Sequence, residues 1–205
     1  MTVDYERLWT AVGGRPGLTQ WYGDPRKLWP SETRHFVPWL IDNLGLLSRC
    51  LALPLTFVGR EASMGGAQHA DILVTDDDGR RIVIEAQMGS SDNNHLGKLP
   101  VYGLMGKADL VVWVLAHDSR QLGFQAEHTR TMHMLNERLI GLMQFAAVAV
   151  TLESDLYPGT GLIDGKVPAL IPRLRRFDLD HPDLRPDPDT AIPPLIVAPP
   201  AELPG

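Results

Sequence analysis

The feature that most constrains the fold is a hairpin signature near the middle of the chain. Two short apolar runs, Ala70–Val74 and Ile82–Ile84, are rich in the β-branched and aliphatic residues that favour strands. The segment Asp76–Gly79 lies between them and ends in an Asp-Gly step, which is a strong signal for a tight turn. The sequence therefore predicts two antiparallel strands joined by this turn.

Two carboxylates mark the open end of the predicted hairpin. Asp71 lies near the start of the first strand, and Glu85 follows the last apolar residue of the second. Because the start of one strand lies beside the end of its antiparallel partner, we expect both side chains at one end of the sheet. Neighbouring carboxylates repel each other, and Mg²⁺ is a usual cation for such a site. The same spacing also suits two solvated strand residues, so both interpretations remain open here.

Two helices are predicted around this hairpin. Apolar residues recur at helical spacing over Arg34–Leu53, and Asp42 lies on this helix outside the apolar stripe. A polar turn after the second strand leads into another helix from about Asn94. This second helix places three polar residues on one face, namely His95, Lys98 and Tyr102. Pro100 requires either that the helix begins late or that it kinks.

The remaining core pattern alternates strands with a helix. Leu55–Glu61 alternates like a strand, and Asp109–Leu115 is nearly continuously apolar, as in a central strand covered on both faces. Residues 124–140 have the amphipathic pattern of a helix, and Phe145–Leu152 is predicted as the last core strand. We therefore expect an α/β fold with a mixed central sheet of about five strands flanked by helices.

The chain divides into a core and two arms. Residues 1–30 are predicted as an N-terminal arm, 31–156 as the core and 157–205 as a C-terminal tail. Aromatic residues of the first arm, including Trp21, Tyr22 and Trp29, are expected to pin it onto the core rather than to stack on bases. The tail carries 11 of the 17 prolines, so we expect an extended segment that packs locally or reaches a partner.

Composition narrows the function classes. The net charge is −6 and no region of the chain is strongly basic, which predicts weak unaided binding to nucleic acid. The single cysteine, Cys50, argues against a disulfide framework or a cysteine metal site. No apolar run is long enough to span a bilayer, so we expect a cytoplasmic protein without a membrane partner.

The order of these motifs resembles the PD-(D/E)XK nuclease superfamily. More closely, the chain is similar to an uncharacterised bacterial branch with an E-x-Q in place of E-x-K. The resemblance covers roughly residues 34 to 140 and is carried by four segments, Phe36–Leu44, Ala70–Leu73, Ile84–Gln87 and His95–Tyr102. It implies a restriction-endonuclease-like core and hydrolysis of phosphodiester bonds, with DNA as the expected substrate, in bacterial or phage defence or DNA processing.

The resemblance also implies roles for individual residues. Asp71 and Glu85 would hold Mg²⁺ or Mn²⁺, and the helical Asp42 would join them. Gln87 stands where the superfamily has a lysine and would position water or phosphate by hydrogen bonds. Lys98 either supplies the missing charge from the next helix or is a solvated lysine. His95 and Tyr102 would support substrate binding.

The alternative is a protein of another class. The acidic balance, the missing lysine and the extended tail also fit a nuclease-like domain that is catalytically weak and serves as a binding or assembly subunit. Such a subunit would contact a protein partner through its tail, and a homodimer is a further possibility for either class. The two hypotheses differ in whether Asp42, Asp71 and Glu85 converge on a divalent ion.

Overall fold

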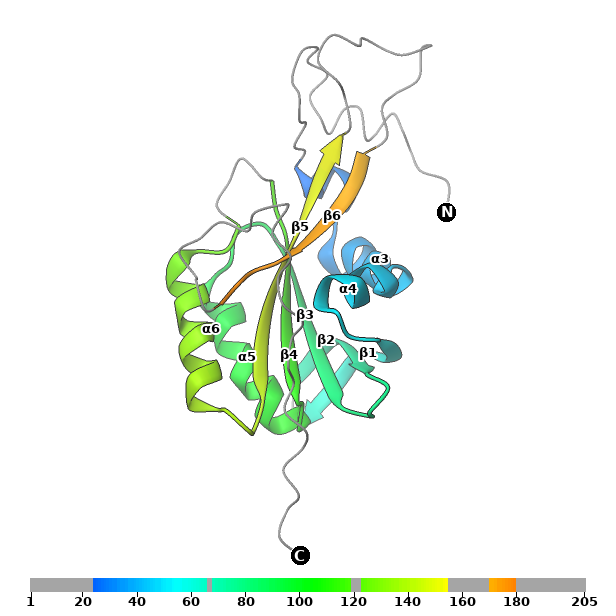
Figure 1. The fold of residues 1–205 in the computed structure, drawn as a ribbon. Coiled ribbons are helices and arrows are strands. Elements are labelled where there is room, and N and C mark those ends of the chain that lie inside the picture. Colours follow the sequence, from blue (N-terminus) through cyan, green and yellow to red (C-terminus); the bar gives the residue numbers. More distant parts are fainter. Residues whose placement is uncertain (1–23, 66–67, 119–122, 155–169, 180–205) are drawn as a thin grey trace, which may run out of the picture.

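The computed structural model describes residues 24–65, 68–118, 123–154 and 170–179, and these form a sheet with helices on both faces (Figure 1). The strands are β1 (Thr56–Gly65), β2 (Gln68–Thr75), β3 (Arg81–Met88), β4 (Leu110–Ala116), β5 (Gln144–Ser154) and β6 (Leu170–Arg176). The helices are α2 (Pro25–Leu28), the wider turn η1 (Glu32–Phe36), α3 (Val37–Asp42), α4 (Leu44–Leu51), α5 (Asn93–Gly106) and α6 (Ala126–Arg138).

The sheet is mixed, and its strands lie in the order of the sequence, from β1 to β6. The central strands β3, β4 and β5 run parallel, whereas β1, β2 and β6 pair antiparallel with their neighbours. Two parallel neighbours need a crossover, and α5 and α6 provide it between β3 and β4 and between β4 and β5. The predicted α/β class with a mixed sheet flanked by helices is confirmed.

The predicted hairpin is present. Strands β2 and β3 pair antiparallel, with Ile72 opposite Ile84 and Thr75 opposite Arg81. In the turn, the Asp76 carboxylate accepts hydrogen bonds from the backbone N–H groups of Asp78 and Arg80, at 3.0 and 2.9 Å. Asp76 therefore closes the turn, at the end of the hairpin away from Asp71 and Glu85.

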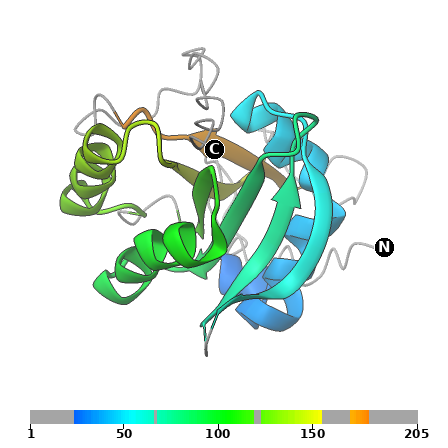
Figure 2. The same cartoon turned by 90° about the horizontal axis from the view of Figure 1, so that it is seen from below.

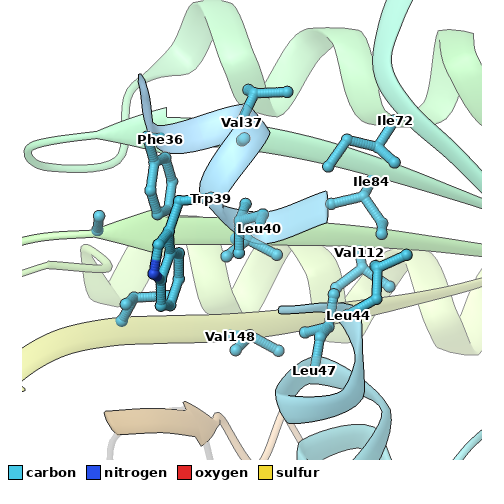
Figure 3. Packing of buried hydrophobic residues seen from close by; sticks show 14 of the residues in the cluster. Phe36, Val37, Trp39, Leu40, Leu44, Leu47, Ile72, Ile84, Val112 and Val148 are labelled. Atoms are coloured by element: carbon cyan, nitrogen blue, oxygen red, sulfur yellow. The ribbon is translucent and has the colours of Figure 1, made fainter. Parts of the chain in front are cut away.

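Strands β2 to β5 each contribute residues to two separate cores, one on each face of the sheet. On one face, Ile72, Ile84, Val112 and Val148 pack against the N-terminal helices η1, α3 and α4 (Figure 3). On the other face, a second cluster that includes Trp113 packs against α5 and α6. Figure 2 shows these two helix layers on opposite sides of the sheet. Strand β4 is buried along its whole length, as expected for a central strand.

The predicted helix over residues 34–53 is interrupted. It begins with a wider i+5 turn, in which the Val37 N–H donates to the Glu32 carbonyl. The α-helical part that follows is then broken at Asn43, between α3 and α4. Asn43 leaves helical geometry with φ −119°, and its side-chain amide donates to the Trp39 carbonyl at 2.8 Å. This competition between a side chain and the helical backbone is typical of asparagine and accounts for the break.

Within the described residues the sheet has six strands rather than about five. The additional strand, β6, comes from the predicted tail and pairs antiparallel with β5. Arg176 lies opposite Val148 at one end of this pairing, and Leu170 lies opposite Ser154 at the other. A proline in its interior, Pro172, is tolerated because β6 is an edge strand. The tail is therefore not uniformly extended, and part of it completes the sheet.

At the N-terminal side, Trp29 is buried and packs against Phe36 and Trp39, so it pins this part of the arm onto the core. The predictions for Trp21, Tyr22 and the rest of residues 1–23 lie outside the described residues, as do those for residues 155–169 and 180–205. None of the helices in the described ranges has the length and apolar character needed to cross a membrane.

Candidate active site

The structure brings Asp71 and Glu85 together. Asp71 on β2 accepts a hydrogen bond at Oδ2 from the backbone N–H of Ala86 on β3, at 2.8 Å. Glu85, the neighbour of Ala86 on β3, is 2% exposed. The two carboxyl groups are close enough to influence each other's ionisation. The hairpin register therefore sets two acidic side chains side by side.

Both carboxyl groups resist ionisation. Burial raises the pKa of Asp71, and the hydrogen bond from Ala86 offsets only part of this effect. Burial also raises the pKa of Glu85, to about 7, and the negative charge of Asp71 adds to the effect. A pair of this kind is stabilised by a shared proton or by a cation.

Lys98 supplies a cation to the pair. It lies on α5, and its Nζ donates a hydrogen bond to Glu85 Oε1 at 2.8 Å. Burial would lower the pKa of Lys98, but the hydrogen bond and attraction of Glu85 outweigh burial and raise it, so the ammonium form is favoured. Its side chain remains 41% exposed and faces both the pair and solvent. Tyr102 is buried one turn further along α5, and burial followed by the charge of Glu85 raises its pKa.

A third acidic residue of the site, Glu32, was not predicted. It lies in η1, and its Oε2 accepts a hydrogen bond from the backbone N–H of Met88 at 2.7 Å. Burial raises the pKa of Glu32, and repulsion by Asp71 adds to this effect. The negative charge of Glu32 in turn contributes to the raised pKa of Glu85. One signal could have identified it, because Glu32 is the sole acidic residue between positions 25 and 41.

The structure does not bring Asp42 to this pair. Asp42 is exposed at the C-terminal end of α3. Among the described residues it shares no hydrogen bond or ion pair with Asp71 or Glu85. The break at Asn43 ends α3 here, and the helical acidic position next to the pair belongs to Glu32, ten residues earlier.

Gln87 has a different environment from the one predicted. Its amide nitrogen donates to the Ser90 carbonyl at 2.8 Å and to Asp92 Oδ2 at 2.7 Å. Its amide oxygen accepts a hydrogen bond from the indole N–H of Trp113 at 3.1 Å. Both ends of the buried amide are thus occupied by protein groups, which accounts for glutamine at this position.

His95 lies between Asp92 and the carboxylate pair. Asp92 caps α5 by accepting the His95 N–H at 2.9 Å, and both of its carboxylate oxygens lie 3.0 Å from His95 Nδ1. His95 Nε2 is 3.9 Å from Glu85 Oε1. Burial would raise the pKa of Asp92, but the hydrogen bonds from His95 outweigh it and lower this pKa. In the sequence, Asp92 shows only the signature of a helix cap.

The donor set suits a hard cation that needs few protein ligands. No group of three or more His, Cys, Asp or Glu side chains in the described ranges is arranged to hold a metal ion. The carboxyl pair itself fits Mg²⁺ or Mn²⁺, because Mg²⁺ is commonly bound through one or two carboxylates, with water and substrate phosphate as further ligands. Asp71 and Glu85 are the residues that would bind it.

No protein-family model matches the chain, and no curated protein matches it. Among solved structures, the chain is similar to a repair endonuclease from Pyrococcus abyssi, with 16% identity, a TM-score of 0.37 and coverage of 54% of this chain and 43% of that one. It is also similar to EndoMS in a complex with double-stranded DNA, with 15% identity, a TM-score of 0.36 and coverage of 60% and 46%. The chain thus matches less than half the length of either structure, and at these TM-scores neither likeness bears on its function.

Proposed function

We propose that this protein is a divalent-metal-dependent nuclease that hydrolyses phosphodiester bonds, with DNA as its substrate. The observation that carries the proposal is the pair of half-buried Asp71 and buried Glu85, with the Lys98 ammonium 2.8 Å from Glu85. Two neighbouring carboxyl groups that are largely withdrawn from water cost folding free energy. Their position beside the partly exposed Lys98 is therefore better explained by a catalytic role than by a contribution to stability.

Each residue of the pair's surroundings has a role in this proposal. A bound Mg²⁺ or Mn²⁺ would balance the charge of the carboxylates and of a phosphodiester and polarise a water. Lys98 is near enough to Glu85 to orient it and exposed enough to meet a phosphate oxygen. It thus takes over the charge of the lysine that the superfamily carries at the position of Gln87. Glu32 adds a further carboxylate at the same end of β3.

Arg26 supports the binding of a polyanion next to this site. Its guanidinium donates to the Met88 carbonyl at 2.8 Å, on the same residue whose N–H binds Glu32. Arg26 is exposed and is therefore available to phosphate groups as well. With Lys98, it gives the acidic site a local basic flank that the net charge of −6 conceals.

The test is cleavage of plasmid and single-stranded DNA by the purified protein with Mg²⁺, with Mn²⁺ and with a chelator. We expect cutting that requires the metal, is abolished by Glu85→Gln and persists in Glu127→Gln. The control removes the same charge from an exposed position on α6. Cutting that survives in Glu85→Gln would show contamination or another site and would contradict the proposal.

The same experiment decides the second hypothesis, a binding or assembly subunit. The commitment of both ends of the Gln87 amide to protein contacts favours it, because both N–H donors of this glutamine are used and cannot bind a phosphate oxygen. If no form of the protein cuts DNA and calorimetry detects no binding of Mg²⁺ or Mn²⁺, the nuclease proposal fails and the subunit hypothesis stands.

A further inference from the structure

The ring of His95 is fixed by Asp92. Both carboxylate oxygens of Asp92 lie 3.0 Å from Nδ1, and the Asp92 carboxylate is favoured in its ionised form, as its lowered pKa indicates. An ionised carboxylate can only accept hydrogen bonds, so the Nδ1 atom must carry a proton. The neutral ring then has its lone pair on Nε2, the nitrogen closer to Glu85.

Asp92 is in turn fixed by Gln87. The amide nitrogen of Gln87 donates to Asp92 Oδ2 at 2.7 Å, while its oxygen is held by the Trp113 indole. The amide cannot rotate without placing like groups together at both ends. The Trp113 ring also stacks on His95, with an interplanar angle of 15° and centroids 6.4 Å apart. Gln87 on β3 thus fixes the Asp92 carboxylate, and Trp113 on β4 packs against the His95 imidazole.

The turn that carries Asp92 is anchored on both sides of this residue. The buried imidazole of His128, on α6, hydrogen-bonds Ser91 Oγ at 2.7 Å and Asn93 Oδ1 at 3.1 Å. Ser91 Oγ also accepts the backbone N–H of Gln125 at 2.9 Å. Asp92 therefore has little freedom to move away from the ring of His95.

The Nε2 atom of His95 is 3.9 Å from Glu85 Oε1, which is too long for a direct hydrogen bond. When the ring is neutral, His95 Nε2 and Glu85 Oε1 are both hydrogen-bond acceptors. One water that donates a hydrogen bond to each of them can bridge this distance. We propose that Gln87 and Asp92 are positioning residues that direct His95 Nε2 toward the carboxylate pair, where it and Glu85 together bind the attacking water. This inference rests on the proposed nuclease function and gives Gln87 an indirect part in it.

The positioning is tested without metal by nuclear magnetic resonance. In the chelated wild-type protein at pH 8, the ring carbon and nitrogen shifts of His95 should report the tautomer with its proton on Nδ1. In Asp92→Asn the new amide cannot satisfy both the Gln87 donor and the His95 donors, so this tautomer should no longer dominate. Asparagine is also a good helix N-cap, so α5 should persist.

A compensating pair of changes separates positioning from folding. Gln87→Glu sets a second carboxylate against Asp92 and should disturb the ring. When it is combined with Asp92→Asn, the new asparagine donates its amide to the new carboxylate at position 87 and presents its oxygen to His95, so the Nδ1–H tautomer should return. In DNA cleavage, each single variant should lose roughly 10- to 100-fold in kcat with KM within about threefold. The double variant should recover part of the loss, because the hydrogen bond from position 87 to the Ser90 carbonyl is still missing.

Two results would overturn the inference. One is a wild-type ring with its proton on Nε2, and the other is an Asp92→Asn protein with unchanged kcat. If the wild-type protein does not cleave DNA, the water-binding role falls together with the proposed function. The tautomer of His95 in the single and double variants still decides, in that case, whether Gln87 and Asp92 position the ring.

Discussion

At the scale of single residues, what matters for the site is where a charged group lies in space, and not which sequence position carries it. A lysine on α5 reaches the Glu85 carboxylate, while the glutamine on β3 holds the turn beside it. The two side chains thus divide the electrostatic and the structural task between two elements. A motif that is defined by neighbouring positions on one strand does not reveal this division.

Lys98 should therefore be essential for cleavage. We expect Lys98→Gln to lower kcat by roughly 100-fold, because a charge that faces the reacting phosphate is removed. Lys107→Gln makes the same change at the exposed C-terminal end of α5 and should stay within about twofold of wild type. Steady-state cleavage of a fluorescent oligonucleotide measures both, and equal effects of the two variants would argue against a role for Lys98 in the reaction.

The acidic residues of the N-terminal helices give a second matched comparison. Glu32→Gln should lower activity by roughly 10- to 100-fold and weaken Mn²⁺ binding in calorimetry, because a carboxylate next to Asp71 is lost. Asp42→Asn removes an exposed charge and should change neither quantity by more than about twofold. The reverse order of effects would restore Asp42 to the site.

Asp71 and Glu85 could be paired from the sequence because one short hairpin determines their neighbourhood. Glu32 could not, because its approach to Met88 depends on an i+5 turn and on packing across 56 positions of the chain. The contact between the Asp92 carboxylate and the His95 ring could not be predicted from the sequence either. Three positions apart, the two residues fit an ordinary helix cap, and only the distances show the ring contact.

At the scale of elements, α5 must lie close to the sheet to bring Lys98 to Glu85. Gly103 permits this approach, since a Cβ at its position would lie 2.4 Å from Met143 Sδ and 3.2 Å from Val111 Cγ2. Gly97, six residues earlier on the same helix, is exposed, and a Cβ there would meet nothing within 4 Å. The two glycines of one helix therefore have different reasons to be small.

Alanine at these two positions should have opposite effects on stability. Gly103→Ala overpacks the interface between α5 and the sheet and should lower the free energy of unfolding by about 1–3 kcal/mol. Gly97→Ala should raise it by about 0.5–1 kcal/mol, because alanine is the better helix former. Urea unfolding followed by circular dichroism measures both. A loss at position 97 as large as that at 103 would show that the close packing at Gly103 is not the cause.

The elements that the sequence predicted correctly are those with local signals. The hairpin has its turn residues between two apolar runs, and β4 is a continuous apolar stretch. The strand β6 was missed because its sequence contains arginines and a proline, and its partner β5 supplies the backbone pairing from a distant part of the chain. Edge strands need less hydrophobic character than central ones. The polar, proline-containing composition of this segment therefore led to the prediction of an extended tail instead of a strand.

At the scale of the whole molecule, the acidic site couples stability to pH. The pKa of Glu85 is raised above its ordinary value by burial and then by Asp71, so the folded protein holds a proton that the unfolded chain releases earlier. The stabilisation from this proton is complete below the pKa of the unfolded chain, near 4.5, and is lost as the pH rises to about 7. The metal-free protein should therefore lose stability between these pH values.

The difference between the wild-type protein and Glu85→Gln removes the contribution of titrating groups that do not interact with Glu85, and it reports on Glu85 together with its coupled neighbour Asp71. In a chelator, the wild-type protein should lose about 2–3 kcal/mol relative to the variant from pH 4.5 to pH 8, at about 1.4 kcal/mol for each pH unit of a raised pKa. Thermal unfolding of both proteins measures this loss. Mg²⁺ at pH 8 should restore stability to the wild type alone, because a ligand that binds only the folded state stabilises it. Parallel pH profiles for the two proteins would show that Glu85 is ionised at little cost, and a cation would then not be needed at this pair.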